Sequence, residues 1–153
     1  MPAAVSVLHA QSGTVAASAT IVTPLIVTGT APLAFGIVYQ GVAKTVRFND
    51  PTSGRMSLSG FGNSQVALTF VLPTALSNGV NTMPINNYRV RVNATNVTAG
   101  ATRIILTSGV PVTRNLVAGS LYFFIGGRVQ PAAAQAGGSY TAPIVLSAAY
   151  TGL

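Results

Sequence analysis

Apolar and polar residues alternate with a period of two along most of this chain. The longest run lies near the C-terminus, where six apolar side chains share one face of an extended segment: Tyr140, Ala142, Ile144, Leu146, Ala148 and Tyr150. Thr141 and Ser147 lie on the opposite face. Because successive side chains of a β-strand point to opposite faces of a sheet, the pattern predicts one long, half-buried strand. We expect its apolar face to lie in the core, against the sheet that contains Phe35 and Phe70.

Shorter alternating runs, rich in β-branched and aromatic residues, predict further strands. They cover residues 33–39, 56–58, 66–72, 88–92, 104–106 and 121–125. Turn-forming sequences such as Asn49-Asp50-Pro51 and Ser77-Asn78-Gly79 separate them. Since no stretch repeats convincingly at the helical period of 3.6 residues, the pattern predicts an all-β protein with an immunoglobulin-like β-sandwich.

Three aromatic residues in succession occupy one of these predicted strands. Tyr122, Phe123 and Phe124 place aromatic rings on both faces of the strand. Both faces of such a strand need cover. We therefore expect a central core strand, whose second face is covered by another sheet or another subunit.

The N-terminus carries an additional candidate strand. Residues 3–11 can form one strand, Ser12-Gly13 interrupts it, and a second strand is predicted over residues 14–22. We therefore divide the chain into an N-terminal extension, residues 1–13, and a β-sandwich domain, residues 14–153. The terminal strand can fold back onto its own domain, or it can add to an exposed sheet edge of a neighbour. The period alone leaves both arrangements open.

The side chains that most active sites require are nearly absent from this sequence. Asp50 is the only carboxylate side chain, His9 is the only histidine, and there is no cysteine. Acid–base pairs, metal clusters and thiol nucleophiles all need such groups. The sequence therefore predicts no enzyme, no catalytic or metal-binding residue and no cofactor. Asp50 is interpreted as a turn residue, and His9 as a partly buried or interface residue.

The net charge of +7 comes from Lys44 and seven arginines that are spread singly along the chain. Only Arg89 and Arg91, two positions apart, are predicted to share a strand face. Proteins that bind nucleic acids usually gather such charges on one face beside stacking aromatic rings. We therefore expect no nucleic-acid partner. No segment reaches the ~18 consecutive apolar residues of a membrane helix, so no membrane span is predicted either.

Several segments resemble a known family. Residues 20–27 (Thr-Ile-Val-Thr-Pro-Leu-Ile-Val), followed by Leu33-Ala34-Phe35-Gly36, resemble the opening of secreted bacterial domains that are similar to spore coat protein U and to archaic chaperone-usher pilins. Later landmarks follow in order: Asn81-Thr82-Met83, Asn87-Tyr88, residues 117–127 and residues 138–150. The resemblance covers residues 19–151. This chain departs from the family in lacking the usual pilin disulfide, and it has Pro32 and Ala34 where many relatives have an acidic residue.

The C-terminal segment carries the most specific part of this resemblance. Chaperone-usher pilins have a glycine twelve positions before a near-terminal tyrosine, and Gly138 and Tyr150 have this spacing here. The resemblance implies a pilin-like C-terminal strand that a chaperone binds or a donor strand seals. Its residues are Gly138, Tyr140, Ile144, Leu146 and Tyr150.

The resemblance implies a structural subunit of an extracellular fibre, a pilus or fimbrium at the cell surface. Such subunits polymerise by donor-strand complementation, in which one subunit's terminal strand completes the next subunit's sheet. The candidate donor residues are Ala4, Val5, Val7, Leu8 and Ala10. The implied partners are neighbouring copies of the chain, a periplasmic chaperone and an outer-membrane usher. Two alternatives remain: a monomeric secreted adhesin or binding module with its N-terminal strand folded back, and a virion or coat component.

Overall fold

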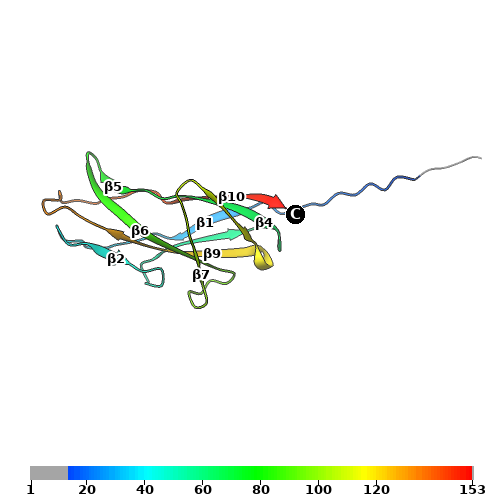
Figure 1. Ribbon diagram of the computed structural model, residues 1–153, viewed down its shortest axis with the longest axis horizontal. Helices are drawn as coiled ribbons and strands as arrows, with labels where there is room; N and C mark the ends of the chain where they lie inside the picture. Colours follow the sequence, from blue (N-terminus) through cyan, green and yellow to red (C-terminus); the bar gives the residue numbers. More distant parts are fainter. Residues whose placement is uncertain (1–13, 153) are drawn as a thin grey trace, which may run out of the picture.

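The computed structural model describes residues 14–152. The predicted donor residues Ala4, Val5, Val7, Leu8 and Ala10, together with His9, lie outside this part of the chain. The described residues form an all-β fold of two antiparallel sheets (Figure 1), in which the short 3₁₀ turn Val117–Gly119 lies between two strands. This arrangement confirms the all-β fold expected from the alternation of apolar and polar residues.

The larger sheet has seven strands and the smaller has three. The order of the larger sheet is β1 (Ile26–Ala31), β3 (Gly54–Ser59), β9 (Ser120–Val129), β6 (Asn81–Asn93) and β5 (Ala75–Asn78). In addition, β2 (Lys44–Val46) pairs with β9, and β7 (Thr102–Ile104) pairs with β6. The smaller sheet has the order β10 (Val145–Gly152), β4 (Gln65–Val71) and β8 (Pro111–Asn115).

Strand β9 is the centre of the larger sheet, as its consecutive aromatic residues predict. Phe123 and Phe124 are both fully buried, although they point to opposite faces. On the inner face, the Phe123 ring meets the Phe70 ring of the smaller sheet edge to face, with centroids 5.5 Å apart. This geometry is favourable for aromatic pairs, so the contact joins the two sheets at the middle of the core.

A second hydrophobic cluster lies where the larger sheet extends past the smaller one. It is formed by Phe35, Val46, Met83, Ile85 and Val129. Here β6 and β9 have no facing sheet, and their inner side is covered by the loops at residues 32–43 and 130–144. Loops cover an apolar sheet less completely than a second sheet does. Space for a groove therefore remains at this end of the molecule.

The outer face of β9 is crossed by backbone at Gly126. A Cβ atom at this position would lie 2.6 Å from the carbonyl oxygen of Val46 and 2.8 Å from the amide nitrogen of Phe48. Only glycine permits such a close approach. In the following turn, the Asp50 carboxylate accepts a 2.7 Å hydrogen bond from the amide of Arg47. The interpretation of Asp50 as a turn residue is thus confirmed.

Two predicted strands are not formed. Residues 14–22 pair with no other described segment, and Val15 and Ile21 are 95% and 92% exposed. Residues 33–39 begin with the predicted alternation, because Leu33 and Phe35 point inward. Gly36 then adopts a positive φ of 62°, which ends the extended conformation and leaves the rest of the segment as a loop.

The C-terminal strand is shorter than predicted and lies in a different place. It begins at Val145, whereas residues 140–144 form only an isolated bridge between Thr141 and Ser77. Leu146 pairs with Phe70 on the neighbouring strand of the same sheet, so β10 does not pack against a sheet that contains Phe70. Phe35 belongs to a loop. The alternation itself is correct, since Leu146 is buried and Ser147 is exposed.

Candidate functional site

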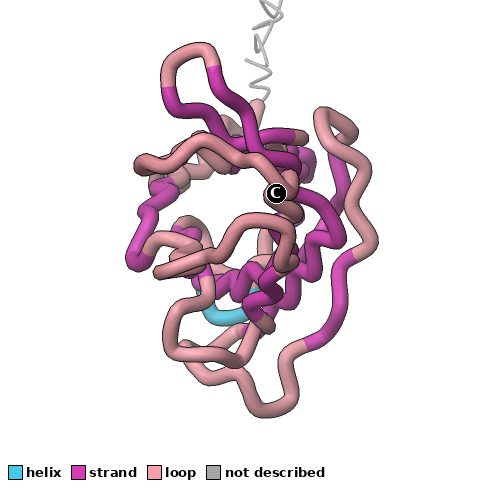
Figure 2. Tube along the Cα trace, turned by 90° about the vertical axis from the view of Figure 1, so that its left-hand side faces the viewer, coloured by secondary structure: helices cyan, strands magenta, loops and turns pink. Residues whose placement is uncertain are grey.

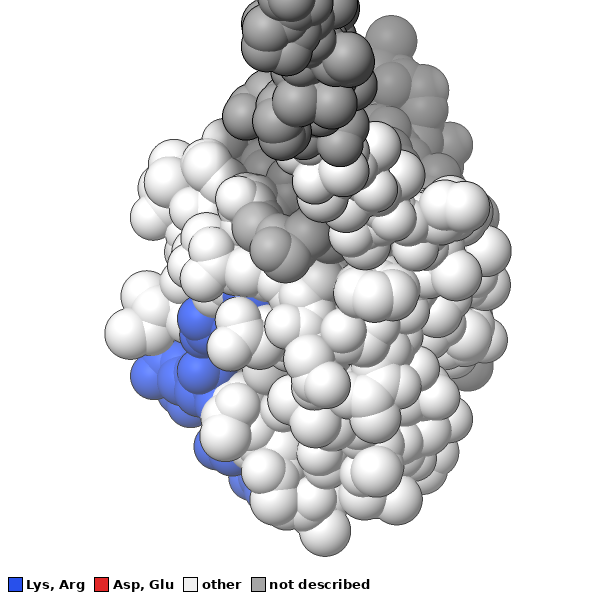
Figure 3. Space-filling model, turned by 90° about the vertical axis from the view of Figure 1, so that its right-hand side faces the viewer, with Lys and Arg blue, Asp and Glu red and all other residues white. Residues whose placement is uncertain are grey.

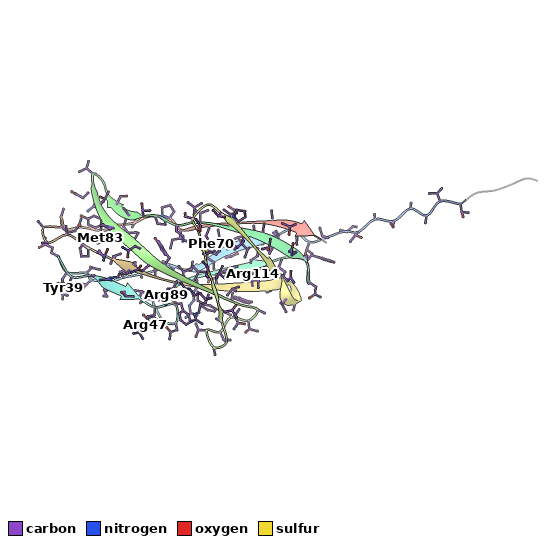
Figure 4. The ribbon with its side chains drawn as sticks, in the orientation of Figure 1. Tyr39, Arg47, Phe70, Met83, Arg89 and Arg114 are labelled. Carbon is purple, nitrogen blue, oxygen red and sulfur yellow. The ribbon has the colours of Figure 1, made fainter. Side chains whose placement is uncertain are left out.

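A groove with a volume of about 1300 Å³ lies at the end where the smaller sheet stops. One wall is formed by residues 29–40 and the other by residues 136–144, while β6 and β9 contribute to the floor. Tyr39 and Met83, both in the lining, lie at the left end of the view in Figure 4. Figure 2 faces this end, at which loops lie among the strands of the two sheets.

The lining of the groove is largely apolar. Met83 and Ile85 lie buried beneath it, whereas Ile37 and Tyr39 are 76% and 71% exposed. The only charged residue of the lining is Arg55, and its guanidinium lies over the ring of Phe124, 5.4 Å from the centroid. An apolar groove of this kind suits the alternate side chains of an extended peptide.

Strand edges at the groove lack partners among the described residues. Strand β1 pairs only with β3, and β10 pairs only with β4, although β1 and β10 contact each other. Gly29, Thr30 and Ala31 of β1 line the groove, as does Ile144 just before β10. Unpaired N–H and C=O groups at a sheet edge accept an added strand. A strand placed here would lie between the first and the last strand of the fold.

Gln135 fastens the loop that closes one end of the groove. Its side-chain amide donates to the carbonyl of Thr82 at 3.1 Å and to the hydroxyl of Tyr140 at 2.8 Å. The Tyr140 hydroxyl in turn donates to the carbonyl of Ala136. The carbonyl of Gln135 accepts a 2.6 Å bond from the side chain of Gln40, on the opposite wall. The sequence gives no signal for this network, because Gln40 and Thr82 lie far along the chain from Gln135.

The described N-terminal residues leave the fold at the end opposite to the groove. Figure 1 shows residues 14–20 running away from the sandwich beside the C-terminus. The hydroxyl of Tyr150 marks the point of departure, because it donates to the carbonyl of Thr23 at 2.7 Å and accepts a bond from the amide of Phe61 at 2.6 Å. Residues 14–22 therefore point away from their own domain.

The residues of the predicted pilin-like strand divide between two places. Gly138, Tyr140 and Ile144 line the groove, while Leu146 and Tyr150 belong to β10 beyond it. Tyr140 and Tyr150 both point inward, with their hydroxyl groups satisfied by hydrogen bonds. Sequence reasoning missed the opposite wall, where Ile37 and Tyr39 are exposed. The only sequence signal for this exposure is that both residues follow Gly36, a residue type that can end a strand.

Burial changes the acidity of one tyrosine beneath the groove. Tyr88 is half-buried between the two hydrophobic clusters, and its hydroxyl donates to the carbonyl of Pro73 at 2.8 Å. Burial disfavours the phenolate and raises the pKa of Tyr88 to about 12. At neutral pH Tyr88 is therefore an uncharged part of the lining.

Within residues 14–152, no group of three or more His, Cys, Asp or Glu side chains lies together as metal ligands would. No helix in the same part of the chain is long and apolar enough to cross a membrane. No family model matches the sequence, and no curated protein is significantly similar to it.

Proposed function

We propose that this chain is a structural subunit of an extracellular fibre that polymerises by donor-strand complementation. The observation that carries the proposal is the apolar groove, which is bordered by the unpaired edge of β1 and by residues 136–144. An extended strand in this groove would pair with free backbone groups and bury apolar side chains at the same time.

The position of the N-terminal tail supports assembly between molecules. The groove and the tail lie at opposite ends of the fold (Figures 1 and 4). The tail of one copy would therefore enter the groove of the next copy, and the same head-to-tail contact would repeat from copy to copy. Contacts of this heterologous kind generate filaments when the rotation between copies does not close a ring. Residues 3–11 would supply the donor strand, with either Val5 and Val7, or Ala4, Leu8 and Ala10, entering the groove.

The scarcity of charge is consistent with a subunit that is covered by its neighbours. Charged residues make up 6% of the sequence, far below the usual quarter. Surfaces that are buried along a fibre need few charges for solubility. We further propose that the fibre is a pilus at the cell surface and that the subunit has no catalytic role.

Removing the donor segment tests this proposal directly. We expect the full chain to form filaments in negative-stain images, whereas a truncation lacking residues 1–12 stays monomeric. A synthetic peptide of residues 1–12 should then raise the melting temperature of the truncated subunit, because a ligand that binds only the folded state stabilises it. Normal filament yield from the truncation would refute donor-strand assembly, and a monodisperse full chain would support the monomeric adhesin instead. Closed shells would favour the coat component.

A pair of matched substitutions tests the groove itself. Ala142→Glu places a carboxylate in the apolar lining, where a donor strand would desolvate it without a partner, so filaments should be lost. Ser147→Glu introduces the same charge on the exposed face of β10 and should leave filaments unchanged. Equal loss of filaments in both variants would mean that the groove is not the assembly site.

A further inference from the structure

Six of the seven arginines lie on the outer face of the larger sheet, although they are scattered along the sequence. They are Arg47, Arg55, Arg89, Arg91, Arg103 and Arg128. Each follows or precedes a buried, inward-facing residue in or next to a strand, so pleating turns all six outward. We call this surface the arginine face. In Figure 3 the Lys and Arg surface gathers along one side of the molecule, and no Asp or Glu surface is visible.

Strand pairing brings these arginines close together. Arg91 of β6 is directly opposite Arg103 of β7 in the register of the sheet. On the other side of Arg91, Phe124 separates it from Arg55. Like charges directly opposite each other destabilise a sheet. Asp50 is the only carboxylate side chain that could neutralise them, and its bond goes to the backbone of Arg47. The arginine face therefore has a strong unneutralised positive potential.

Four of these arginines surround a shallow hollow of about 610 Å³. The lining comprises Arg47, Arg89, Arg103 and Arg128, with Thr45 and Asn87 adding hydroxyl and amide groups. In Figure 4, Arg47 and Arg89 lie next to each other on the outer side of the larger sheet. Guanidinium groups bind carboxylate and sulfate oxygens in pairs, and the neutral polar groups suit hydroxyl-bearing ligands.

The two aromatic rings that line the hollow, Phe48 and Tyr88, already have partners. The guanidinium of Arg91 lies 4.4 Å from the ring centroid of Phe48, and that of Arg55 lies over Phe124. The remaining ring in the hollow, Tyr88, is held by Pro73 and packs in the core. Base stacking supplies much of the affinity of proteins for single-stranded nucleic acids. The hollow therefore offers charge and hydrogen bonds, while both of its rings are already engaged.

We propose that the arginine face binds an acidic polysaccharide, a linear sugar polymer that carries carboxylate or sulfate groups. The hollow has room for a single chain of sugars but is too small to enclose a nucleic-acid duplex. Its guanidinium groups would pair with the acidic groups, and Thr45 and Asn87 would bond to sugar hydroxyls. None of the four arginines of the hollow lines the groove, so this binding does not depend on polymerisation.

Binding of defined polymers to the full chain tests the inference. The probes are heparin as a sulfated polysaccharide, polygalacturonate as a carboxylated one, and uncharged dextran. We expect both acidic polymers to bind with an affinity that falls as salt rises, because salt screens exposed charges, and dextran not to bind. The double variant Arg89→Gln and Arg128→Gln should weaken binding about tenfold or more, since two charge-assisted contacts are lost.

A charge-matched control distinguishes binding at the hollow from a general attraction that depends only on the net charge of the protein. Lys44→Gln with Arg114→Gln removes two positive charges outside the arginine face, because Lys44 bonds to the carbonyl of Ile37 and Arg114 lies on β8 of the smaller sheet. This control should retain the wild-type affinity, and both variants should keep the wild-type urea midpoint. Equal weakening in the two variants would overturn the proposal. So would absent binding, or tighter binding of single-stranded or duplex DNA of matched charge than of the acidic polysaccharides.

Discussion

Leu146 and Ser147 are neighbours in β10 with opposite surroundings. Leu146 is 7% exposed and belongs to the main core, whereas Ser147 faces outward. Leu146→Ala removes buried methyl groups and leaves a cavity, so we expect a loss of about 2–5 kcal/mol in the free energy of unfolding. Ser147→Ala should change it by less than about 0.5 kcal/mol. Urea melts of the isolated subunit measure both, and equal effects would mean that the assigned faces of β10 are wrong.

The raised pKa of Tyr88 predicts a loss of stability in alkali. The unfolded tyrosine ionises with its ordinary pKa of 10.0, while the folded one holds its proton up to a pKa of about 12. Between these values the folded state binds more protons, so the stability contributed by Tyr88 declines as pH rises above 10. We expect urea midpoints at pH 9 and pH 11 to differ more in the wild type than in Tyr88→Phe. An identical pH dependence in both proteins would mean that the raised pKa of Tyr88 does not cause the loss of stability.

At the scale of the element, Gly126 decides whether the chain that leaves β2, at Val46 to Phe48, can pass close over β9. A side chain here would meet the backbone of Val46 and Phe48, and backbone cannot move aside as a flexible side chain can. We expect Gly126→Ala to destabilise the fold by about 1–3 kcal/mol through overpacking. Gly29→Ala is the matched control, because no heavy atom lies within 4 Å of its added Cβ. Similar melting temperatures for the two variants would exclude the close approach.

The strands that sequence alone predicts are those with a clear inner and outer face. Strand β4 alternates regularly, since its inward side chains fill the main core. Strand β9 is buried on both faces over most of its length, and its run of aromatic residues predicts it instead. Strand β1 could not be found in this way because five of its six residues are exposed. Its extended conformation comes from its pairing with β3, which is a long-range interaction. Conversely, residues 14–22 have apolar residues suited to a strand but find no partner within the described chain.

At the scale of the whole molecule, the two candidate surfaces arise from strand order, which no local pattern contains. Arg103 and Arg128 gain their neighbours only when β7 and β9 flank β6. The motif Arg89-Val90-Arg91-Val92 does signal an outward basic face for one strand. The groove likewise depends on how far β6 and β9 extend past the smaller sheet. Local alternation therefore predicts the fold class and the faces of single strands, while the joining of those faces into sites requires the topology.

The contacts of Tyr150 have a mechanical consequence. Its hydroxyl links the tail at Thr23 to the C-terminal strand, just before the chain enters β1. The tail leaves roughly along the long axis of the molecule (Figure 1), and the hydrogen bonds between β1 and β3 lie across the strand direction. Tension on the tail therefore acts on these bonds in shear, so that they bear the load together instead of opening one after another. A strand that buries little surface can in this way serve as a strong tether.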